Sequence, residues 1–378
     1  MQRAGESASQ QVGEKLRILI AGGGTGGHVI PALALARELR DAHGAEVRFV
    51  GTAKGLETRL VPEAGFKLTL VRSGQLKNVG LATRLRTAVD LPLGVAECVR
   101  LLREFKPQVV VGVGGYASGP GMLAAILLRV PTLVYEPNAV PGMTNRWLGR
   151  WVSAAAVNFG QTVKYFRNAE LTGVPVRPEV FALPARPAGA APRLLVTAGS
   201  QGARVFNQAM PKIWAELLAA VPGLTIVHQA GARHVEATRA AYAASGAGGS
   251  PETGARWRVE AFLTDMPAQY GAADMVLARS GSTVAELCAA GRPSLLVPFA
   301  AAADDHQRKN AEVLVDAGAA VMLLERDATP AALLEALRGL LLDAPRRAEM
   351  AVKARSLARS GALERIAAMV AELAKKKG

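Results

Sequence analysis

The chain contains 378 residues, 50% of them hydrophobic and 20% charged, and this length predicts two domains because single hydrophobic cores stop growing near about 250–300 residues. Its two cysteines lack a metal-ligand spacing and its five histidines form no HExxH pair, so we expect no metal site built from side chains. The net charge of +14 indicates nucleic acid, a phosphate-rich substrate or an anionic membrane surface, unless it serves solubility alone.

In chain order, residues 1–14 are polar, lack the apolar core of a signal peptide, and are predicted to form a disordered tail. Apolar, β-branched runs then alternate with Ala/Leu-rich helical stretches, which favours parallel sheets covered on both faces. The uncharged run at 109–128 is long enough to span a membrane, yet its glycines and Pro120 indicate a strand, a turn and a helix. The expected strands are 17–21, 47–51, 108–113, 131–136, 193–199, 224–229, 273–278 and 293–299.

A proline- and alanine-rich segment at 182–192 separates two halves that begin alike. RILIAGGGTGGH begins the first half and RLLVTAGSQGAR the second, and in each a strand runs into a glycine-rich turn and a helix. We therefore predict an α/β fold of two similar Rossmann-like domains. A second interruption, at 244–256, is interpreted as a surface loop.

Four predicted strand-to-helix turns are rich in glycine. Glycine lets backbone N–H groups approach an anion, and the following helix adds unpaired N–H groups and partial positive charge. In parallel α/β sheets such turns lie at the carboxyl edge, where ligands bind. Four of them in two halves suggest two phosphorylated ligands facing each other across a cleft. The turns are GGGTGGH (22–28), GVGGYASGP (112–120), AGSQGA (198–203) and RSGSTVAE (279–286).

The first turn also matches the G-x-G-x-x-G pattern of dinucleotide-binding enzymes through Gly22, Gly24 and Gly27. That class requires an acidic residue about 20 positions further on, at the end of the second strand, to hold ribose hydroxyls. The second strand ends VRFVGTAKG and has no acid at its tip, which argues against a dehydrogenase. No GxxxxGK[ST] occurs, so a P-loop ATPase is unsupported as well.

Glu286 has two interpretations. Thr283 and Glu286 fit a capping box, T-x-x-E, and Gly291 with Pro293 would end the helix. Alternatively, the Glu286 carboxylate binds ribose hydroxyls while the helix N-terminus faces a diphosphate. These two roles of Glu286 do not exclude each other, since the carboxylate can cap the helix at one time and bind the ligand at another.

Taken together, these motifs resemble the bacterial MurG-type transferases, over residues 15–375. That family adds N-acetylglucosamine from UDP-N-acetylglucosamine to the lipid-linked muramyl-pentapeptide of peptidoglycan synthesis. The motifs that carry the resemblance are GGTGGH (23–28), VGGYASGP (113–120), EPN (136–138), GVPVR (173–177), GSQGA (199–203), RSGSTVAE (279–286) and DDHQRKNA (304–311).

The resemblance implies the two-Rossmann-domain glycosyltransferase fold (GT-B), with the domains facing across a cleft. The first domain would comprise 15–174, on the acceptor and membrane side, joined by a C-terminal helix at about 358–378. The second, 175–357, would bind the UDP-sugar. It also implies a peripheral enzyme on the cytoplasmic face of the bacterial inner membrane, with no metal cofactor and no nucleic acid partner.

Site roles follow from the same resemblance. Thr25, Gly26 and Gly27 match the turn beside the sugar, Asn138 the asparagine that contacts it, and Gly114, Gly115 and Tyr116 the acceptor side. Arg177 and Ser200 match residues at or near the donor phosphates, and Leu263 matches the backbone position that reads uracil. Glu286 matches the ribose-binding glutamate. Backbone contacts to the diphosphate come from Ser282, Thr283 and Val284, and the polar pair near the donor sugar is His306 and Gln307.

Two departures from the family pattern affect these assignments. Pro137 replaces the glutamine of the usual E-Q-N motif, which leaves Asn138 in place but is expected to alter its loop. The RSGSTVAE loop is one residue shorter than the common form, so its backbone contacts at 282–284 depend on a changed geometry.

The implied reaction is attack of a sugar hydroxyl on the anomeric carbon, with inversion and loss of UDP. Helix N-termini and Arg177 could stabilise the leaving diphosphate without a metal. His28 is the candidate base because histidine titrates near about 6.5. The alternative is a histidine that orients the loop or contacts the acceptor phosphate without taking a proton.

Residues 72–106 combine basic side chains with many Leu and Val, as in a surface that meets a membrane or in an ordinary amphipathic helix. Three rival functions remain: another glycosyltransferase acting on a glycolipid or natural product, a UDP-sugar 2-epimerase, and a sugar-nucleotide or polyanion binding protein without turnover.

Overall fold

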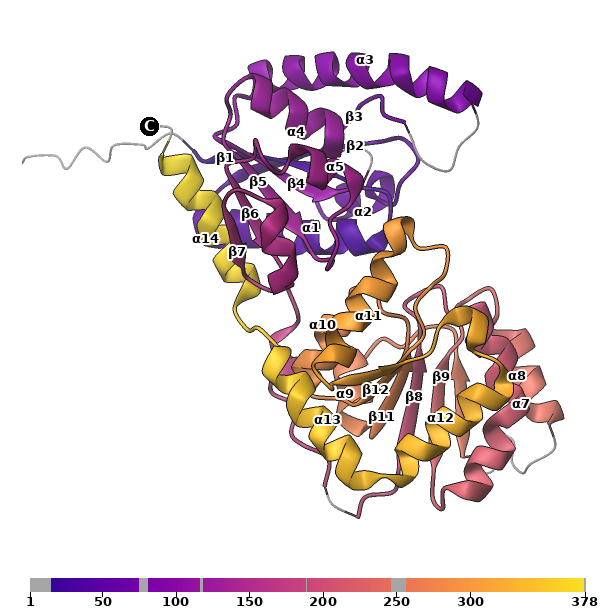
Figure 1. Ribbon diagram of the computed structural model, residues 1–378. Coiled ribbons are helices and arrows are strands. Elements are labelled where there is room, and N and C mark those ends of the chain that lie inside the picture. The colour runs from indigo at the N-terminus through magenta and orange to yellow at the C-terminus, as the bar shows by residue number, and fades with distance from the viewer. Residues whose placement is uncertain (1–14, 75–80, 116–117, 188, 246–255, 377–378) are drawn as a thin grey trace, which may run out of the picture. The chain divides into compact units, whose positions relative to one another are not determined.

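The structure is a computed structural model that describes residues 15–74, 81–115, 118–187, 189–245 and 256–376 (Figure 1). The predicted tail at 1–14, Tyr116 and most of the predicted loop at 244–256 lie outside the described residues. Within the described part, no helix combines the length and apolar character needed to cross a membrane.

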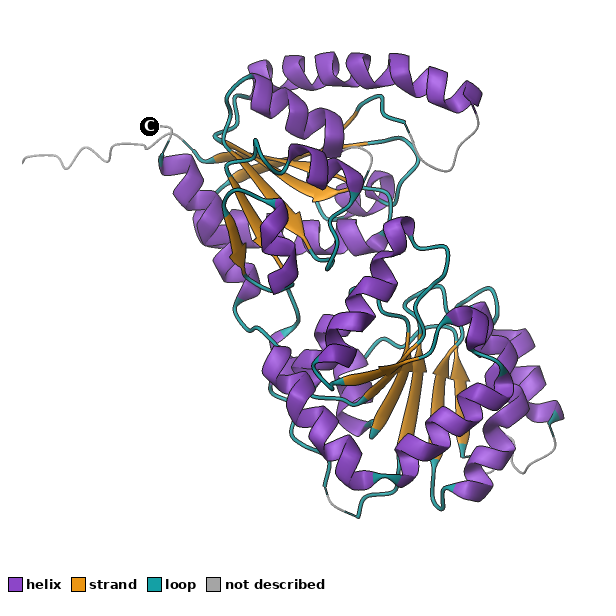
Figure 2. Cartoon of the chain, viewed as in Figure 1, coloured by secondary structure: helices purple, strands orange, loops and turns teal. Residues whose placement is uncertain are grey.

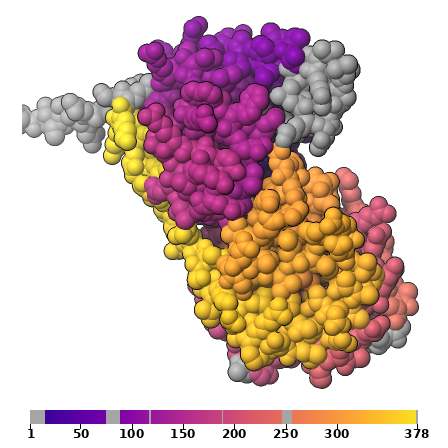
Figure 3. Space-filling view, in the orientation of Figure 1, coloured from indigo at the N-terminus to yellow at the C-terminus, as the bar shows by residue number. Residues whose placement is uncertain are grey.

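The chain divides into two compact units. One contains the described residues up to 135, together with 147–155 and those from 363 on; the other contains 136–146 and 156–362. The last helix, α14 (Ala362–Lys375), returns to the first unit and buries Ile366, Ala367 and Val370 there, as the yellow segment against the magenta surface shows (Figure 3). The domain limits predicted from the sequence remain a prediction.

Strands and helices alternate along the whole chain, and helices cover both faces of each sheet (Figure 2). The elements of the first half are β1 (Arg17–Gly22), α1 (Gly26–His43), β2 (Glu46–Gly51), α2 (Glu57–Glu63), β3 (Lys67–Leu70), α3 (Leu81–Phe105), β4 (Val109–Gly114), α4 (Ser118–Leu127), β5 (Thr132–Glu136), α5 (Met143–Leu148), β6 (Ala154–Val157) and β7 (Ala169–Leu171).

The second half begins with the short helix α6 and repeats the same alternation. Its elements are α6 (Pro178–Phe181), β8 (Arg193–Thr197), α7 (Arg204–Ala220), β9 (Thr225–Gln229), α8 (Val235–Ala244), β10 (Trp257–Glu260), α9 (Met266–Ala272), β11 (Met275–Ala278), α10 (Thr283–Ala290), β12 (Ser294–Leu296), α11 (His306–Asp316), β13 (Ala320–Met322), α12 (Pro330–Leu342) and α13 (Ala344–Leu357).

All eight predicted strands are confirmed, and the run at 109–128 is indeed a strand followed by a helix. The short strands β3, β6, β7, β10 and β13 were not predicted. The α/β class is confirmed too.

The two sheets have the same strand order. The first runs β3-β2-β1-β4-β5-β6-β7 and the second β10-β9-β8-β11-β12-β13, with parallel pairing from β3 to β5 and throughout the second sheet. The order reverses between β1 and β4, and again between β8 and β11. Ligands bind open α/β sheets beside such a reversal, outside the carboxyl ends of the strands. The four glycine turns are the turns that follow these four strands.

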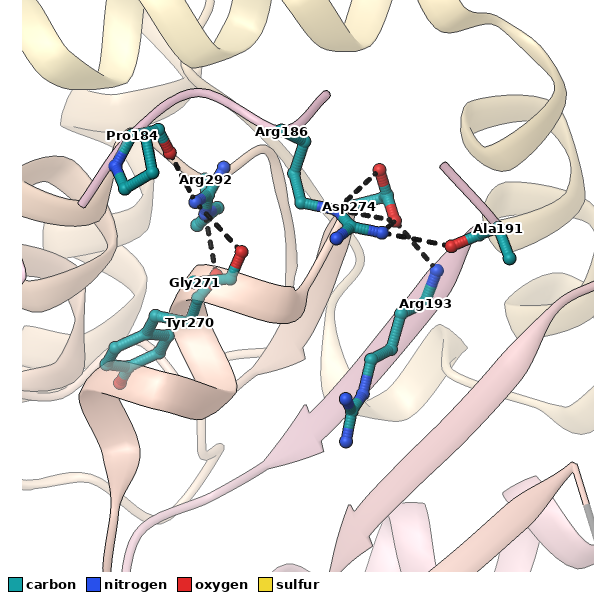
Figure 4. A network of polar contacts seen from close by, with 8 residues as sticks. All are labelled: Pro184, Arg186, Ala191, Arg193, Tyr270, Gly271, Asp274 and Arg292. Atoms are coloured by element: carbon teal, nitrogen blue, oxygen red, sulfur yellow. Dashed lines mark hydrogen bonds and ion pairs between the residues drawn. The ribbon is translucent and has the colours of Figure 1, made fainter. Parts of the chain in front are cut away.

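The described residues between α6 and β8, 182–187 and 189–192, lack regular structure and are held by partly buried charged groups (Figure 4). Arg292, 3% exposed, donates to the backbone oxygens of Tyr270 (2.7 Å), Pro184 (2.9 Å) and Gly271 (3.3 Å). Nearby, Arg186 pairs with Asp274, which also accepts the backbone N–H of Arg193 at 2.8 Å. Burial lowers the pKa of Arg292, and so do the neighbouring arginines.

Arg292→Ala should therefore destabilise the second unit, because it removes a buried guanidinium and its hydrogen bonds to the carbonyls of Tyr270, Gly271 and Pro184. Hydrogen bonds to charged groups contribute about 1.5–3 kcal/mol each, and only the bond to Tyr270 is fully buried, so we expect a loss of about 3 kcal/mol. Thermal unfolding followed by circular dichroism should show a midpoint lower by about 6–12 °C. Arg338→Ala, at an exposed site on α12, is the control and should leave the midpoint within about 1 °C. An unchanged midpoint for Arg292→Ala would contradict this account.

Candidate functional site

The glycine turns after β1 and β4 interlock in the first unit. The Gly23 N–H donates to the Gly114 carbonyl at 3.3 Å, and a Cβ built on Gly115 would lie 2.2 Å from the Gly23 oxygen. Gly24, Gly114 and Gly115 all have φ between +80° and +94°, which glycine adopts without strain. These two turns could not approach each other with side chains present.

The N-terminus of α1 faces out of this pair of turns. Thr25 is its N-cap residue and makes no side-chain cap hydrogen bond, so the first N–H groups of the helix, at Gly26 and Gly27, are not satisfied by it. Thr25 and Gly27 are exposed. Unpaired N–H groups and the helix dipole together suit an anion at this position.

His28 is half-buried in the first turn of α1. Its ring packs on the backbone of Gly114, where an added Cβ would lie 2.9 Å from Cδ2, and its Nδ1 is 3.4 Å from the Thr25 hydroxyl. The structure thus brings together five predicted residues of the first unit, Thr25, Gly26, Gly27, Gly114 and Gly115, around His28. Its role as a base remains a prediction.

In the second unit, Glu286 and Arg177 lie near Tyr270, a residue that no sequence motif indicated. The hydroxyl of Tyr270, itself fully buried, donates to Glu286 Oε2 at 2.9 Å. Burial raises the pKa of Glu286, while this hydrogen bond and the positive charge of Arg177 act in the opposite direction. Arg177 is exposed, so the cation that acts on this carboxylate lies at the protein surface.

The predicted capping box is wrong. The N-cap of α10 is Ser282 rather than Thr283, its backbone is helical (φ −61°, ψ −22°), and it makes no side-chain cap hydrogen bond. The helix begins one residue earlier than the capping box needs, at Thr283, and the Glu286 carboxylate accepts a hydrogen bond from Tyr270 instead. The predicted helix end is confirmed, since Gly291 is left-handed with φ +58°. Glu286 is therefore not engaged in capping.

Asn138 is held at both ends of its amide. Its Nδ2 donates to Glu136 Oε1 at 3.0 Å, and its Oδ1 accepts from Nδ2 of the buried Asn310 at 3.2 Å. The backbone N–H of Asn138 also donates to Glu136, at 3.0 Å. Pro137 has no N–H to contribute, and none is needed, because the donors that hold this loop belong to its neighbours. The expected effect of Pro137 on this loop remains a prediction.

The start of α11 is tied to the turn after β11. Asn310 donates to the Ser280 carbonyl at 3.0 Å, and the Ser280 hydroxyl donates to the Gln307 carbonyl at 2.7 Å. The Gln307 side-chain oxygen accepts the Phe299 N–H at 3.0 Å. His306 Nδ1 lies 2.7 Å from the Ala303 carbonyl oxygen. Gln307 thus lies beside Ser280 and Gly281 in the turn after β11.

The Arg279 side chain fixes the turn after β11 to neighbouring parts of the second unit. It is 9% exposed, donates to the carbonyls of Val297 (3.0 Å) and Pro298 (3.1 Å), and forms an ion pair with Glu325. Its guanidinium also lies over the Phe299 ring, 5.2 Å from the centroid. The arginine in RSGSTVAE is therefore structural here, and of residues 279–286 only Ser282 is exposed.

The loop of Ser200 and the backbone of Leu263 are both hydrogen-bonded to Gln229, a second residue that no sequence motif indicated. Gln229, 3% exposed at the end of β9, donates to the Gly199 carbonyl at 2.6 Å and accepts the Leu263 N–H at 3.2 Å. One amide therefore fixes the loop that carries Ser200 and the backbone of Leu263. The Leu263 N–H already donates to Gln229. A nucleobase at this position would therefore bind the Leu263 carbonyl, or would have to displace Gln229.

Neither Tyr270 nor Gln229 could be identified from a pattern of neighbouring residues in the sequence. Tyr270 precedes Glu286 by 16 positions and Gln229 precedes Leu263 by 34, spacings that no helical or strand period connects. Among the residues that the structure describes, no group of three or more His, Cys, Asp or Glu side chains could hold a metal ion.

Comparison with known proteins adds to this geometry. Residues 18–157 match the glycosyltransferase family 28 N-terminal domain, and residues 193–366 match its C-terminal domain. A relative from Anaeromyxobacter dehalogenans, named UDP-N-acetylglucosamine–N-acetylmuramyl-(pentapeptide) pyrophosphoryl-undecaprenol N-acetylglucosamine transferase, is 45% identical over 96% of this chain and 94% of its own.

Solved structures agree. The crystal structure of MurG from Acinetobacter baumannii is 32% identical, with a TM-score of 0.78 over 94% of this chain and 99% of that chain. A UDP-N-acetylglucosamine 2-epimerase has a TM-score of 0.61 at 15% identity, over 93% of this chain and 94% of its own, which shows a common fold alone. The GT-B glycosyltransferase fold expected from the sequence is confirmed.

Glu286→Ala should weaken the binding of UDP by about 10- to 100-fold, since a charged acceptor is lost from the ribose hydroxyls. Isothermal titration calorimetry would measure it, with the exposed Glu335→Ala as the matched control. Because the pKa of Glu286 is raised, wild-type affinity should begin to fall at a higher pH than for an ordinary glutamate, whereas Glu286→Gln should show no such fall. Wild-type affinity in Glu286→Ala would refute the ribose assignment.

Proposed function

The chain belongs to glycosyltransferase family 28, and on that premise we propose that it transfers N-acetylglucosamine from UDP-N-acetylglucosamine to a lipid-linked N-acetylmuramyl-pentapeptide. The acceptor is the C4 hydroxyl of the muramyl sugar, and the product is the disaccharide intermediate of peptidoglycan synthesis. The observation that carries the proposal is the 45% identity across 96% of the chain to a transferase of that name. The polar contacts around Glu286 and Asn138 support it.

The donor is assigned to the second unit. Glu286 would accept hydrogen bonds from the ribose hydroxyls, and the Leu263 backbone would contact uracil. The diphosphate would lie near Arg177, Ser200 and the start of α10, at Ser282, Thr283 and Val284, where a positive side chain and a helix N-terminus stabilise negative charge. Asn138, His306 and Gln307 would contact the sugar.

The acceptor is assigned to the first unit, with Gly114, Gly115 and Tyr116 on its side and Thr25, Gly26 and Gly27 beside the transferred sugar. His28 would take the proton of the C4 hydroxyl as its oxygen bonds to the anomeric carbon. At the same time the bond from that carbon to the diphosphate oxygen breaks, and UDP leaves with the electron pair. Attack from the face opposite UDP inverts the anomeric centre.

We propose that no metal bound by side chains takes part, because Arg177 and the helix N-termini supply the positive charge that the leaving group needs. A sugar-nucleotide epimerase would need no acceptor. The epimerase similarity is limited to the fold, so this alternative is not favoured.

The decisive experiment supplies radiolabelled UDP-N-acetylglucosamine with the lipid-linked muramyl-pentapeptide and looks for a labelled lipid-linked disaccharide. A donor-only reaction is the control for epimerase activity. Formation of an epimer without acceptor, and no disaccharide with it, would overturn the proposal.

In the same assay, His28→Ala should lower kcat by about 100-fold, the contribution typical of a positioned base, while the affinity for UDP stays unchanged. His43→Ala provides the matched control, since His43 is exposed at the other end of the same helix. If His28→Ala turned over at the wild-type rate, His28 would not be the base.

We further propose that the first unit meets the membrane, as a peripheral protein on the cytoplasmic face. Trp147 and Trp151 are 71% and 64% exposed, and Val89 on α3 and Leu127 on α4 are exposed as well. Arg129 lies in the same unit and is exposed. Apolar side chains mixed with basic ones favour an anionic lipid surface. Residues 75–80 of the predicted membrane segment, and the side chains of 81–87, lie outside the described part.

The membrane proposal predicts flotation with vesicles containing phosphatidylglycerol at low salt, and weaker flotation at about 0.5 M salt, where charges are screened. Replacing Trp147 and Trp151 together by alanine should reduce the bound fraction several-fold. Leu342→Ala, which removes an exposed apolar side chain from the second unit, should have no effect. No flotation of the wild type at low salt would contradict the proposal.

A further inference from the structure

A buried carboxylate lies beneath the first glycine turn. Glu57, the first residue of α2, is completely buried although glutamate is among the residues most rarely found inside a protein. None of the motifs discussed above includes it. A buried carboxylate is unfavourable unless its oxygens receive hydrogen bonds, so its partners indicate what it does.

Every hydrogen bond to Glu57 comes from a loop, within the part of the chain that the structure describes. Oε2 accepts the Gly24 N–H at 2.7 Å, and Oε1 accepts the N–H and the hydroxyl of Thr52, both at 3.0 Å. No ion pair to Glu57 is present among the described residues. The negative charge is therefore stabilised by two turns of the first sheet, those after β1 and β2, rather than by a basic side chain.

Three glycines make room for this carboxylate. A Cβ built on Gly23 would lie 2.2 Å from Oε1, one on Gly55 would lie 1.8 Å from Oε2, and one on Gly51 would lie 2.7 Å from Cγ. Gly23 and Gly55 thus serve a purpose other than contact with a ligand. Their missing side chains let the carboxylate reach the backbone of the turn.

The hydrogen bond to Gly24 has a consequence for the residues that follow. Gly24 has φ +94°, and it is held from both sides, by its N–H to Glu57 and by its carbonyl, which accepts the Leu56 N–H at 3.0 Å. The next residue, Thr25, is the N-cap of α1, and His28 lies in its first turn. The backbone angles of Gly24 therefore set where the first N–H groups of α1 and the His28 ring point.

We propose that Glu57 is a positioning residue for the transfer reaction: its carboxylate holds Gly24 so that the N-terminus of α1 and His28 are preorganised for the acceptor. The inference rests on the proposed function and deepens it. Preorganised groups raise kcat because no reorganisation is needed in the transition state, and a displacement of about 1 Å can cost 100-fold. The donor is assigned to the second unit, so its binding should not depend on Glu57.

The test compares Glu57→Gln with Glu63→Gln, the same substitution at an exposed position on the same helix. The amide keeps the shape of the side chain but has one acceptor oxygen, so either Gly24 or Thr52 faces an NH₂ group instead. We expect Glu57→Gln to lower kcat by about 10- to 100-fold with KM for UDP-N-acetylglucosamine within twofold. Glu63→Gln should match the wild type in both constants.

Thr52→Val separates positioning from mere stability. It removes one donor to the carboxylate and leaves the bond to Gly24, so it should lower the unfolding midpoint but not kcat. Amide hydrogen exchange of the peptide covering residues 22–28 should be faster in Glu57→Gln and unchanged in Thr52→Val. If Glu57→Gln does not fold, Glu57→Asp takes its place, because its shorter side chain keeps the charge and cannot reach Gly24, and the same loss of kcat is expected.

Wild-type kcat in a folded Glu57→Gln or Glu57→Asp would overturn the inference, as would unchanged exchange at 22–28. If the proposed function were wrong, the result would differ, because wild type and Glu63→Gln would then form no disaccharide either. In that case hydrogen exchange alone decides whether Glu57 positions the turn.

Discussion

The reversal of strand order in each parallel sheet is the constraint on which the site depends. Strands that leave the reversal in opposite directions carry their helices to opposite faces, so the turns after β1 and β4, and after β8 and β11, are not covered by a crossover. Each turn therefore lies at the carboxyl end of its strand, where ligands bind open α/β sheets. The repetition of this arrangement in both halves gives the protein two such places, and family 28 membership explains the pair, since a transferase must bind a donor and an acceptor.

Three carboxylates of the described chain differ in how many hydrogen bonds the protein gives them. Glu57 accepts three hydrogen bonds from the protein, and Glu136 accepts four, two from Asn138 and one each from Gly142 and Asn145. Glu286 accepts one, from Tyr270, within the described part of the chain. A carboxylate can accept about four, so Glu57 and Glu136 are largely satisfied and Glu286 keeps capacity for a ligand. The number of hydrogen bonds received from the protein thus distinguishes Glu57 and Glu136 from Glu286, the carboxylate assigned to ribose.

Sequence patterns predicted most of the fold, because eight strands are continuous apolar runs and each glycine turn follows one of them. The unpredicted strands are short, such as β7 with three residues, and none forms a long apolar run. The capping box failed for a related reason. T-x-x-E describes a local contact, and Glu286 instead finds the Tyr270 hydroxyl, which lies on α9 and is brought near by packing. A capping pattern describes contacts between neighbouring residues and takes no account of hydrogen-bond donors from other helices.

The alternation of strands and helices, the position of the four turns and the family resemblance could all be predicted, because each depends on residues close together in the chain. Which polar groups meet depends on the packing of the whole chain. Gln229 reaches Leu263 across 34 positions, Asn138 reaches Asn310 across 172, and Glu57 reaches Gly24 across 33. A buried polar group must find a partner wherever the fold supplies one, and no spacing along the chain specifies where that is.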